Sequence, residues 1–424
     1  MTTKKPSVTK NIIWSSAGSI IDLGCQWLIS ILVVRLCSSF DAAGVLSLAT
    51  AIYGIFHPVA QYRMYTFHLS DIHRDYSLGE YIGFNIITCL IALIGCAGYA
   101  VLTTSSNYLP TIFLYCLYRL LKVSIDVLHA EDQRNDRMDY IGVSLALQGV
   151  ASVLAFIAIF GTTSNLNAAL IGMSLAVAGV GLLYDLRKTK QFDKLGAKIS
   201  GGRARNLLIK CLPIVLASLA CSLTPAIPRQ CLLNVQGENA LGIYASIAAP
   251  IAIIQMGANY VYYPLLGYFA QRWDSKDRTT FYSLLVQVTI GMLAVGVGCI
   301  FILKIFGAQL LSVLFGPEIT SHLDLVNPMI ACSITTAYMW FINDLLVSLR
   351  LFKWTVLGSL TSLILAITTT NPAVQTFGMN GVSYTLLISY ASGVCVMIAS
   401  LIIANYTSRK HSRSANASAK NDID

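Results

Sequence analysis

Apolar residues gather into about twelve long runs that are separated by short polar stretches. Most runs approach the roughly 20 residues that a helix needs to cross about 30 Å of hydrocarbon. Within a bilayer a segment must satisfy its own backbone amides, so a lone run of this kind has to be a helix. The pattern predicts an all-α polytopic membrane protein with spans at residues 13–29, 42–62, 81–102, 108–128, 139–160, 167–185, 206–228, 240–268, 281–303, 325–348, 354–370 and 381–404. Between two of these runs, Leu310–Phe315 fits a short interfacial helix.

The composition agrees with a chain whose solvent is mostly lipid. Hydrophobic residues make up 55% of the 424 residues, charged residues only 12%, and the mean hydropathy is +0.66. A soluble protein carries roughly 25% charged residues, so this chain has too little charge to coat a soluble surface. A net charge of +9 would point to nucleic acid in a soluble protein, but the positions of the basic residues argue otherwise.

Lys and Arg are concentrated in every second connection between the runs. The largest basic connection is Arg187–Arg205, at the midpoint of the chain, whereas residues 37–40, 103–107, 161–165 and 368–378 on the other side hold almost none. Basic connections stay in the cytoplasm. Both termini are therefore expected to be cytoplasmic, which requires an even number of spans.

The same pattern divides the chain into halves. We expect an N-terminal six-helix bundle at residues 1–190, a cytoplasmic linker at residues 191–204 and a C-terminal six-helix bundle at residues 205–406. The polar residues 407–424 are rich in Ser, Asn and Lys, and we expect them to form a disordered cytoplasmic tail.

The two halves carry an internal repeat. Asp41–Ala51 aligns without gaps to Asn239–Ala249, and in the same register His57 meets Gln255. The matched segments begin six spans apart, so both copies run in the same direction. This predicts two bundles related by a pseudo-twofold axis along the membrane normal, and transporters built this way place the substrate path between the halves. Chance similarity between two Ala- and Gly-rich helices is the alternative.

The sequence lacks the motifs of soluble enzymes and of metal sites. It has no P-loop, no GxSxG and no HExxH, and its eleven cysteines lie mostly inside apolar runs without CxxC or Cys/His spacing. Cysteines in such runs are small packing residues. We therefore expect a protein that is not an enzyme and that holds no metal or cofactor, with coupling to H⁺ or Na⁺ left open.

Three charged residues lie within one span, where each costs at least about 2.5–3.5 kcal/mol unless it faces a cavity or a partner. Arg119, Lys122 and Asp126 are spaced by three and four residues, which puts them on one face of a helix. The set is either a cationic patch that lines a central cavity or a structural ion pair between Lys122 and Asp126 that leaves Arg119 unmatched.

Other basic residues mark the ends of spans. Arg35 and Arg229 lie at the outer ends of two equivalent spans, and Arg63 and Lys210 lie near inner ends. Either these side chains extend to lipid headgroups, or they line a substrate path together with Arg119 and Lys122 and form a cationic ladder along it.

Carboxylates within spans are the candidates for a coupling ion. Asp22, with Gln26 one turn later on the same face, and Asp344, beside Asn343, lie in spans, as does Asp126. Each is either a proton or sodium site or a partner in a helix–helix hydrogen bond.

Four segments, taken in order, carry a resemblance to a known family. They are Arg35 with Asp41–Gly44, the connection Tyr62–Asp71 with Tyr76–Phe84, the turn Ala130–Gly142, and Pro228–Arg229 with Leu241–Ala245. In these segments the chain resembles the polysaccharide (O-antigen type) flippases of the multidrug/oligosaccharidyl-lipid/polysaccharide exporter (MOP) superfamily. The resemblance covers about residues 10–270, and the remainder agrees by hydropathy. The family usually has a basic residue where this chain has Asn85.

The resemblance implies a fold, a substrate and partners. It implies two six-helix bundles with a MATE-like fold around a central cationic cavity that opens alternately to each side, in the bacterial cytoplasmic (inner) membrane. The implied substrate is an oligosaccharide on a polyprenyl diphosphate, used for lipopolysaccharide O-antigen or capsule biosynthesis. Arg119 and Lys122 suit its diphosphate, because guanidinium and ammonium groups match phosphate oxygens. The expected partners are this lipid-linked oligosaccharide, membrane lipids and the polysaccharide polymerase machinery, but no nucleic acid.

Two other functions remain open. A drug or cation antiporter of the same fold should line its cavity with carboxylates and aromatic residues, whereas Arg119 and Lys122 prevail in the charged span. A membrane-embedded polysaccharide polymerase or transferase often carries a long outer connection with catalytic acids, and the outer connections here are short and nearly uncharged. A lipid-linked oligosaccharide flippase is therefore the favoured interpretation.

Overall fold

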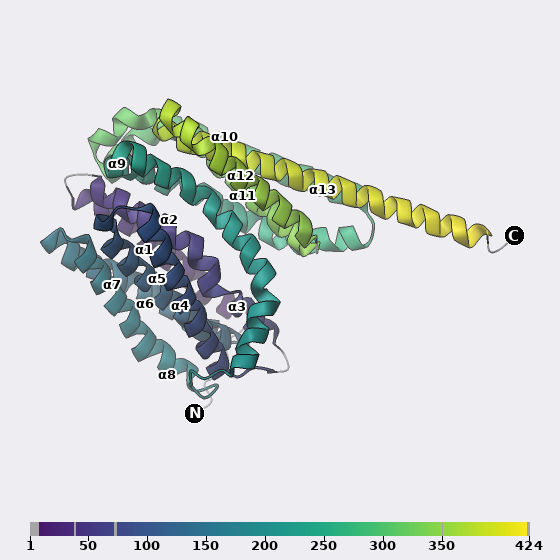
Figure 1. Cartoon of the computed structure of the whole chain (residues 1–424), viewed down its shortest axis with the longest axis horizontal. Helices are drawn as coiled ribbons and strands as arrows, with labels where there is room; N and C mark the ends of the chain where they lie inside the picture. The colour runs from purple at the N-terminus through teal and green to yellow at the C-terminus, as the bar shows by residue number, and fades with distance from the viewer. Residues whose placement is uncertain (1–7, 38–39, 72–73, 350, 422–424) are drawn as a thin grey trace. The chain divides into compact units, whose positions relative to one another are not determined.

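The computed structural model of the chain describes residues 8–37, 40–71, 74–349 and 351–421, and these residues are helical almost throughout (Figure 1). No strand occurs in these ranges. Two 3₁₀ turns, η1 (Ser106–Tyr108) and η3 (Pro317–Leu325), and one π-helical turn, η2 (Gly181–Asp185), join the helices. In chain order the helices are α1 (Val8–Arg35), α2 (Asp41–Gln61), α3 (Met64–Ser70), α4 (Leu78–Thr103), α5 (Leu109–Arg134), α6 (Met138–Thr163), α7 (Leu166–Val180), α8 (Leu186–Thr189), α9 (Gly201–Asp274), α10 (Arg278–Phe315), α11 (Val326–Ser348), α12 (Phe352–Phe377) and α13 (Met379–Asn421).

Each predicted span coincides with helical structure. α9 contains two of the spans, and Gly237 between them has a φ of +84° that interrupts the helix. Leu310–Phe315 forms the last turns of α10 rather than a separate helix. Within the described ranges, nine helices are long and apolar enough to cross a membrane, and α5 is not among them because charged side chains interrupt it. The predicted fold class, an all-α multi-pass membrane protein, is confirmed.

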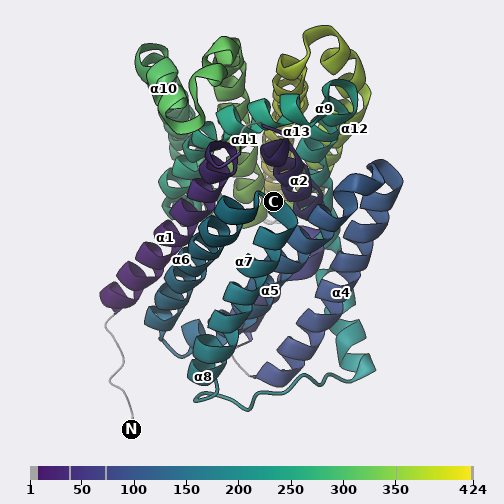
Figure 2. The same ribbon diagram turned by 90° about the vertical axis from the view of Figure 1, so that its left-hand side faces the viewer.

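The chain folds as two compact units. The first comprises residues 1–249 and 309–322, and the second comprises residues 250–308 and 323–424. In the first unit α1 packs along α6, α2 packs on α4 and α5, and α7 packs on α5 and α6 (Figure 2). In the second unit α13 packs along α12 and α11. These boundaries differ from those of the two predicted six-helix bundles, whose division by sequence repeat stays a prediction.

α1 and α6 approach closely because glycines face each other across their contact. A Cβ atom on Gly18 would overlap the carbonyl oxygen of Gly142, and a Cβ atom on Gly142 would overlap that of Trp14. Small residues let membrane helices pack backbone against backbone. This contact fixes α1 within the first unit and so determines where Asp22 lies.

The two copies of the sequence repeat contact each other within the first unit. A Cβ atom on Gly44 would overlap the carbonyl oxygen of Glu238, and a Cβ atom on Gly242 would overlap that of Phe40. The alignment that pairs Asp41 with Asn239 makes these two contacts equivalent, with the copies exchanged. The amide of Asn239 also donates to the carboxylate of Asp41 at 3.3 Å. A reciprocal contact of this kind is what a twofold axis between two copies produces.

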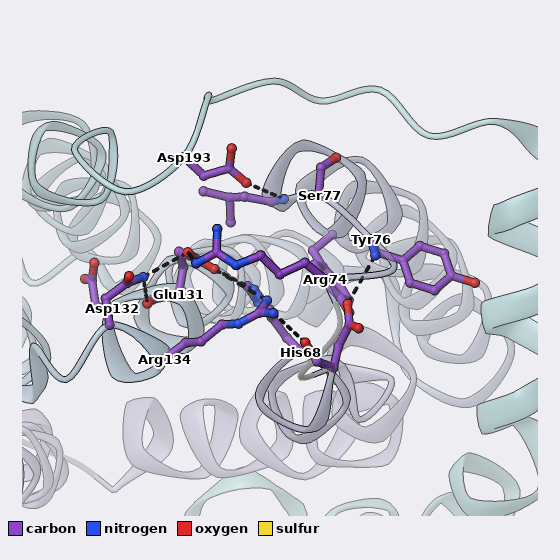
Figure 3. Close-up of polar contacts among 12 residues, drawn as sticks. His68, Arg74, Tyr76, Ser77, Glu131, Asp132, Arg134 and Asp193 are labelled. Carbon is purple, nitrogen blue, oxygen red and sulfur yellow. Dashed lines mark hydrogen bonds and ion pairs between the residues drawn. The ribbon is translucent and has the colours of Figure 1, made fainter.

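The linker between the repeats runs past the beginning of α4. Asp193 accepts a hydrogen bond from the backbone amide of Leu78 at 3.1 Å (Figure 3). Gly79 and Gly83 lie against the linker backbone, where added Cβ atoms would stand 3.2–3.3 Å from it. Larger residues at these two positions would therefore push the linker away from α4.

The C-terminal helix is longer than the sequence led us to expect. α13 continues to Asn421, so a disordered tail beginning at residue 407 is not what the structure shows. Residues 407–421 contain neither Pro nor Gly, and no residue in this stretch interrupts a helix. Residues 422–424 lie outside the described part of the chain.

Candidate functional site

α5 carries a stripe of charged side chains on one face. Arg119, Lys122 and Asp126 follow one another at spacings of three and four residues, as predicted, and His129 extends the stripe by a further turn. Asp126 is partly exposed, whereas Lys122 and His129 are buried. Charges in such an apolar setting require partners, and the partners come from neighbouring helices of the first unit.

Lys122 is bound to Asp22 of α1. The ammonium donates to Asp22 Oδ1 at 2.6 Å, and both side chains are 11% exposed. Gln26 donates to the other oxygen of Asp22 at 2.7 Å. The ion pair that we considered between Lys122 and Asp126 is therefore wrong, and Lys122 pairs with Asp22 instead. The reason is packing, because the close glycine contact of α1 with α6 brings Asp22 within reach of α5.

Arg119 has polar partners but no anionic one. One guanidinium nitrogen donates to the amide oxygen of Gln26 at 2.8 Å, and the guanidinium lies 5.4 Å from the ring centre of Tyr53. The Nε atom has no hydrogen-bond partner in the described structure, and no carboxylate lies at ion-pair distance there. Lys122 is thus neutralised by a carboxylate of the protein, whereas Arg119 has no carboxylate partner among the described residues.

Arg35 and Arg229, the two outer arginines, have different partners. Arg35 donates to the carbonyl oxygens of Leu314 at 2.9 Å and Ser312 at 3.1 Å, and also to that of Val313, at the C-terminal end of α10. The last carbonyl groups of a helix carry partial negative charge, so a cation stabilises them. Arg229 is half-buried, and its Nε has no partner among the described residues. Arg35 is therefore held by protein rather than extended to lipid headgroups.

Arg63 and Lys210, the inner basic residues, are next in sequence to members of one apolar cluster. Arg63 is exposed, as is Lys210. Their chain neighbours Tyr62 and Cys211 belong to the same buried cluster, and the Tyr62 hydroxyl donates to the carbonyl oxygen of Leu208 at 3.1 Å. The structure thus brings the end of α2 and the start of α9 together. A substrate-binding role for these residues stays a prediction.

The remaining coupling-ion candidates also have partners. Asp126 lies 3.6 Å from Nδ1 of His129. In the second unit, Asp344 accepts a hydrogen bond from the Tyr262 hydroxyl at 3.0 Å, which fits the helix–helix alternative given for it.

Sequence reasoning missed a buried polar cluster at the end of α5. His129 faces Asp185 of η2, which in turn accepts a hydrogen bond from Ser144 of α6 at 2.9 Å. Asp132 accepts one from Thr189 of α8 at 3.1 Å. The predicted span ended at residue 128, just before His129, although its spacing of three from Asp126 was a usable signal.

A second polar cluster fastens the short helix α3 to α5 (Figure 3). His68 Nε2 lies 2.9 Å from Glu131 Oε2, and guanidinium groups of Arg74 and Arg134 lie 4.0 Å from the same carboxylate. The His68 ring stacks on Tyr81 at 4.1 Å between centres. Three basic side chains, His68, Arg74 and Arg134, thus surround Glu131, and positive charge is in excess in this group.

Asp71 orders the connection between α3 and α4. Its oxygens accept hydrogen bonds from the backbone amides of Asp75 at 2.9 Å and Tyr76 at 3.1 Å and from the Tyr81 hydroxyl at 2.9 Å. Burial raises the pKa of Asp71, but these hydrogen bonds together with Arg134 outweigh it and hold the pKa below its ordinary value. Asp71 is therefore a carboxylate in the folded protein at neutral pH.

Comparison with known proteins gives one relative by sequence and several by structure. No family model matches the chain. Capsular polysaccharide biosynthesis protein CapF of Staphylococcus aureus is 26% identical over 315 residues, which cover 73% of this chain and 78% of that protein.

Solved structures share the whole fold. An inward-facing multidrug resistance MATE family transporter of the MOP superfamily has a TM-score of 0.63 at 12% identity and covers 97% of both chains. The Vibrio cholerae MATE transporter VcmN has a TM-score of 0.59 at 11% identity, over 93% of this chain and 96% of that one. A MOP superfamily transporter from Pyrococcus furiosus has a TM-score of 0.56 at 12% identity, over 96% and 99%. These findings confirm the MATE-like fold of a multi-pass membrane protein. In sequence the chain is similar to a capsular polysaccharide biosynthesis protein, which agrees with the resemblance to polysaccharide flippases.

Proposed function

We propose that the protein flips a polyprenyl-diphosphate-linked oligosaccharide across the bacterial cytoplasmic membrane for the synthesis of a cell-surface polysaccharide. The observation that carries the proposal is Arg119, a half-buried guanidinium within a membrane helix that has no carboxylate partner among the described residues. An unbalanced cation in such a place favours an anionic ligand. The capsule-biosynthesis relative and the transporter fold make a diphosphate headgroup the fitting anion.

Lys122 is the second contact for that headgroup. Its present partner, Asp22, is itself held by Gln26, which also binds Arg119. A diphosphate that approaches Arg119 competes with Asp22 for the ammonium group of Lys122. Binding of the substrate and release of Asp22 are then linked, and Asp22 is free to take up H⁺ or Na⁺ in the exchange.

The same proposal sets the orientation of the chain. The basic connections, with Arg187–Arg205 the largest, lie in the cytoplasm, and so do both termini. The lipid-linked substrate enters from that side and is released to the outer leaflet, where the polymerase machinery uses it. Placement of Arg187–Arg205 outside the cell by an impermeant label would contradict this orientation.

A drug or cation antiporter is the second candidate, because solved neighbours include multidrug MATE transporters. Such a protein needs a free carboxylate for a cationic drug. Asp22 is instead neutralised by Lys122, Asp126 faces His129, and Arg119 adds a positive charge without a carboxylate partner among the described residues. The net sign of the site therefore favours an anion.

The experiment is flipping of a fluorescent polyprenyl-diphosphate oligosaccharide in proteoliposomes that contain the full chain. Arg119→Ala should lower the rate about ten- to a hundredfold, because a charge-assisted hydrogen bond contributes about 1.5–3 kcal/mol. Arg119→Lys should keep part of the rate. Arg187→Ala removes an exposed arginine outside the site and should leave the rate unchanged. Full activity in Arg119→Ala would refute the proposed substrate site.

A further inference from the structure

His129 lies between two carboxylates at the end of α5. Its Nε2 atom is 3.3 Å from Asp185 Oδ1, and its Nδ1 atom is 3.6 Å from Asp126 Oδ1. The side chains of His129 and Asp185 are 2% and 0% exposed, whereas that of Asp126 is 36% exposed. The three groups therefore form a row that leads from an accessible carboxylate to a fully buried one.

Asp132 adds a third carboxylate on the buried side. It is fully buried, its Oδ1 atom accepts the hydrogen bond from Thr189, and its Oδ2 atom has no partner among the described residues. His129 and Asp185 both lie within electrostatic range of it. A buried carboxylate oxygen without a donor is unfavourable when charged and is relieved by a proton.

The cations near this cluster are engaged elsewhere. Arg137 pairs with Asp139 at 2.8 Å, and the Lys188 ammonium lies over the rings of Tyr140 and Tyr184, at 5.0 and 5.9 Å. Each of these groups is held on the cytoplasm-predicted side of the cluster.

The neighbouring acid and the groups on α2 do not supply a cation either. Glu131, next to Asp132, has its own set in His68, Arg74 and Arg134. On the side of α2, His57 lies within electrostatic range of both Asp126 and Arg119. Solvent screens the exposed Asp126, and His129 faces Asp185, so Asp132 remains without a cation among the described residues.

The backbone places Asp185 in this position by a local distortion. Gly181–Asp185 is a π-helical turn at the end of α7, and a Cβ atom on Gly181 would stand 3.0 Å from the Ile125 side chain of α5. Ser144 donates to Asp185 Oδ2 and accepts from Gln148 at 2.9 Å, while His129 faces Asp185 Oδ1, so the carboxylate is held from two sides. Single π-helical turns inside helices occur frequently at functional sites.

We propose that Asp132, His129 and Asp185 form a proton-binding site, which exchanges H⁺ with its surroundings through Asp126. The ligand is a proton rather than a metal ion, because no group of His, Cys, Asp or Glu in the described structure has metal-holding geometry. The site was not among the coupling-ion candidates read from the sequence, of which only Asp126 touches it.

The site is linked to the substrate contacts through α5. Asp126 lies one turn from Lys122 and two turns from Arg119 on the same face. Protonation removes negative charge from this end of the stripe and strengthens the attraction of the two cations for an anion, by on the order of tenfold over such a distance. By linkage, an anion bound at Arg119 strengthens proton binding by the same factor. This role in transport rests on the proposed function, whereas proton binding itself does not.

The first test is infrared spectroscopy of the full chain in lipid nanodiscs during a pH titration. We expect the C=O band of a protonated carboxyl group at neutral pH. It should vanish in Asp132→Asn and persist in Glu131→Gln, the matched control at the neighbouring cluster. His129→Gln removes a cation beside Asp132 and should shift the titration of the band to higher pH, while His68→Gln should not. An unchanged band in Asp132→Asn overturns the proposal, and so does a titration unmoved in a folded His129→Gln protein.

The second test is flipping of the fluorescent lipid in proteoliposomes with an imposed pH gradient. His129→Gln should reduce the stimulation by the gradient roughly 5–150-fold, the usual range of coupling between two sites. His68→Gln should retain the stimulation. If the wild-type protein flips no polyprenyl diphosphate but shows the band, the proposed function fails and the proton site stands. If flipping persists and the band is absent, the proton site fails alone.

Discussion

His68 and His129 are both buried against a carboxylate of the first unit, but the charges around them have opposite sign. His68 faces Glu131 at 2.9 Å, and two arginines lie at 4.0 Å from the same carboxylate. His129 faces Asp185 at 3.3 Å, and the charged groups beside it are further carboxylates. The histidine–carboxylate pair of His68 and Glu131 therefore lies among additional positive charges. The pair of His129 and Asp185 lies among additional negative charges.

The helical repeat of α5 separates the two clusters. Residues two apart on an α-helix point about 200° away from each other, so Glu131 and His129 face opposite sides of α5. One side meets α3, with its basic surroundings, and the other meets α7 and η2. In Figure 3, Asp132 points away from His68 and Arg74. Neighbours from other helices, rather than the residues of α5 alone, decide what each histidine does.

The largest effect on stability is expected when the carboxylate of Glu131 is removed from the cluster that joins α3 to α5. Glu131→Ala leaves His68, Arg74 and Arg134 facing one another, and the loss of one partner from a buried charge group costs about 3–5 kcal/mol. Chemical unfolding in detergent should show a decrease of this size. Glu131→Gln keeps the shape and isolates the charge. A decrease below about 1 kcal/mol would show that the cluster does not fasten α3.

Asp71, which is bonded to Tyr81 beside His68, makes the stability of this region sensitive to acid. Its folded pKa is depressed, so it stabilises the fold above its unfolded pKa and loses that contribution as pH falls through the folded value. Asp71→Asn should lower the free energy of unfolding at neutral pH by about 1.5–3 kcal/mol, as expected for hydrogen bonds to a charged group. Unfolding measured over an acid-to-neutral series should also depend less on pH than in the wild type. An unaltered acid dependence would show that another group is responsible.

Tyr81→Phe separates ring stacking from hydrogen bonding in the same cluster. It keeps the ring that stacks on His68 and removes the hydroxyl that donates to Asp71 at 2.9 Å. The two backbone donors remain on Asp71, so the unfolding free energy should fall by about 1 kcal/mol. Tyr62→Phe loses a hydroxyl bonded to a carbonyl oxygen instead and serves as the matched control. If Tyr81→Phe lowers the unfolding free energy as much as Asp71→Asn does, the stabilisation by the Asp71 carboxylate comes entirely from its hydrogen bond with Tyr81.

The smallest effect on stability should come from the other side of α5. If Asp132 carries a proton, Asp132→Asn replaces a neutral acid by a neutral amide of the same shape. The unfolding free energy at neutral pH should then stay within about 0.5 kcal/mol of the wild type, as for a substitution without a named mechanism of loss. A decrease in unfolding free energy as large as that of Glu131→Ala would instead indicate that Asp132 is charged and ion-paired. The two clusters would then not differ in their charge balance.

The helices and one face of the site follow from local sequence. Long apolar runs must be helices in lipid, and all the predicted spans coincide with helical structure. The stripe formed by Arg119, Lys122 and Asp126 also depends only on spacing along one helix. These features need no knowledge of which helix packs on which.

The partners of the stripe could not be derived in this way. Lys122 meets Asp22 across one hundred positions of sequence because Gly18 and Gly142 bring α1 against α6. Asp185 reaches His129 through a π-helical turn that hydropathy does not reveal. The sequence supplied the ionisable groups, while helix packing and a backbone irregularity assigned their partners.

The mutual contact of the two repeat segments has an evolutionary consequence. At Gly44 and Gly242 each segment presses on the main chain of the other, at Glu238 and Phe40. Main-chain atoms are the same whatever side chain they carry, so Phe and Glu can occupy equivalent positions without harm, whereas the glycines cannot be replaced without separating the copies. A segment that recognises its own copy in this manner would, as an unduplicated ancestor, have joined two identical chains. A gapless repeat whose two copies contact each other reciprocally is what the fusion of two identical, self-associating chains would leave.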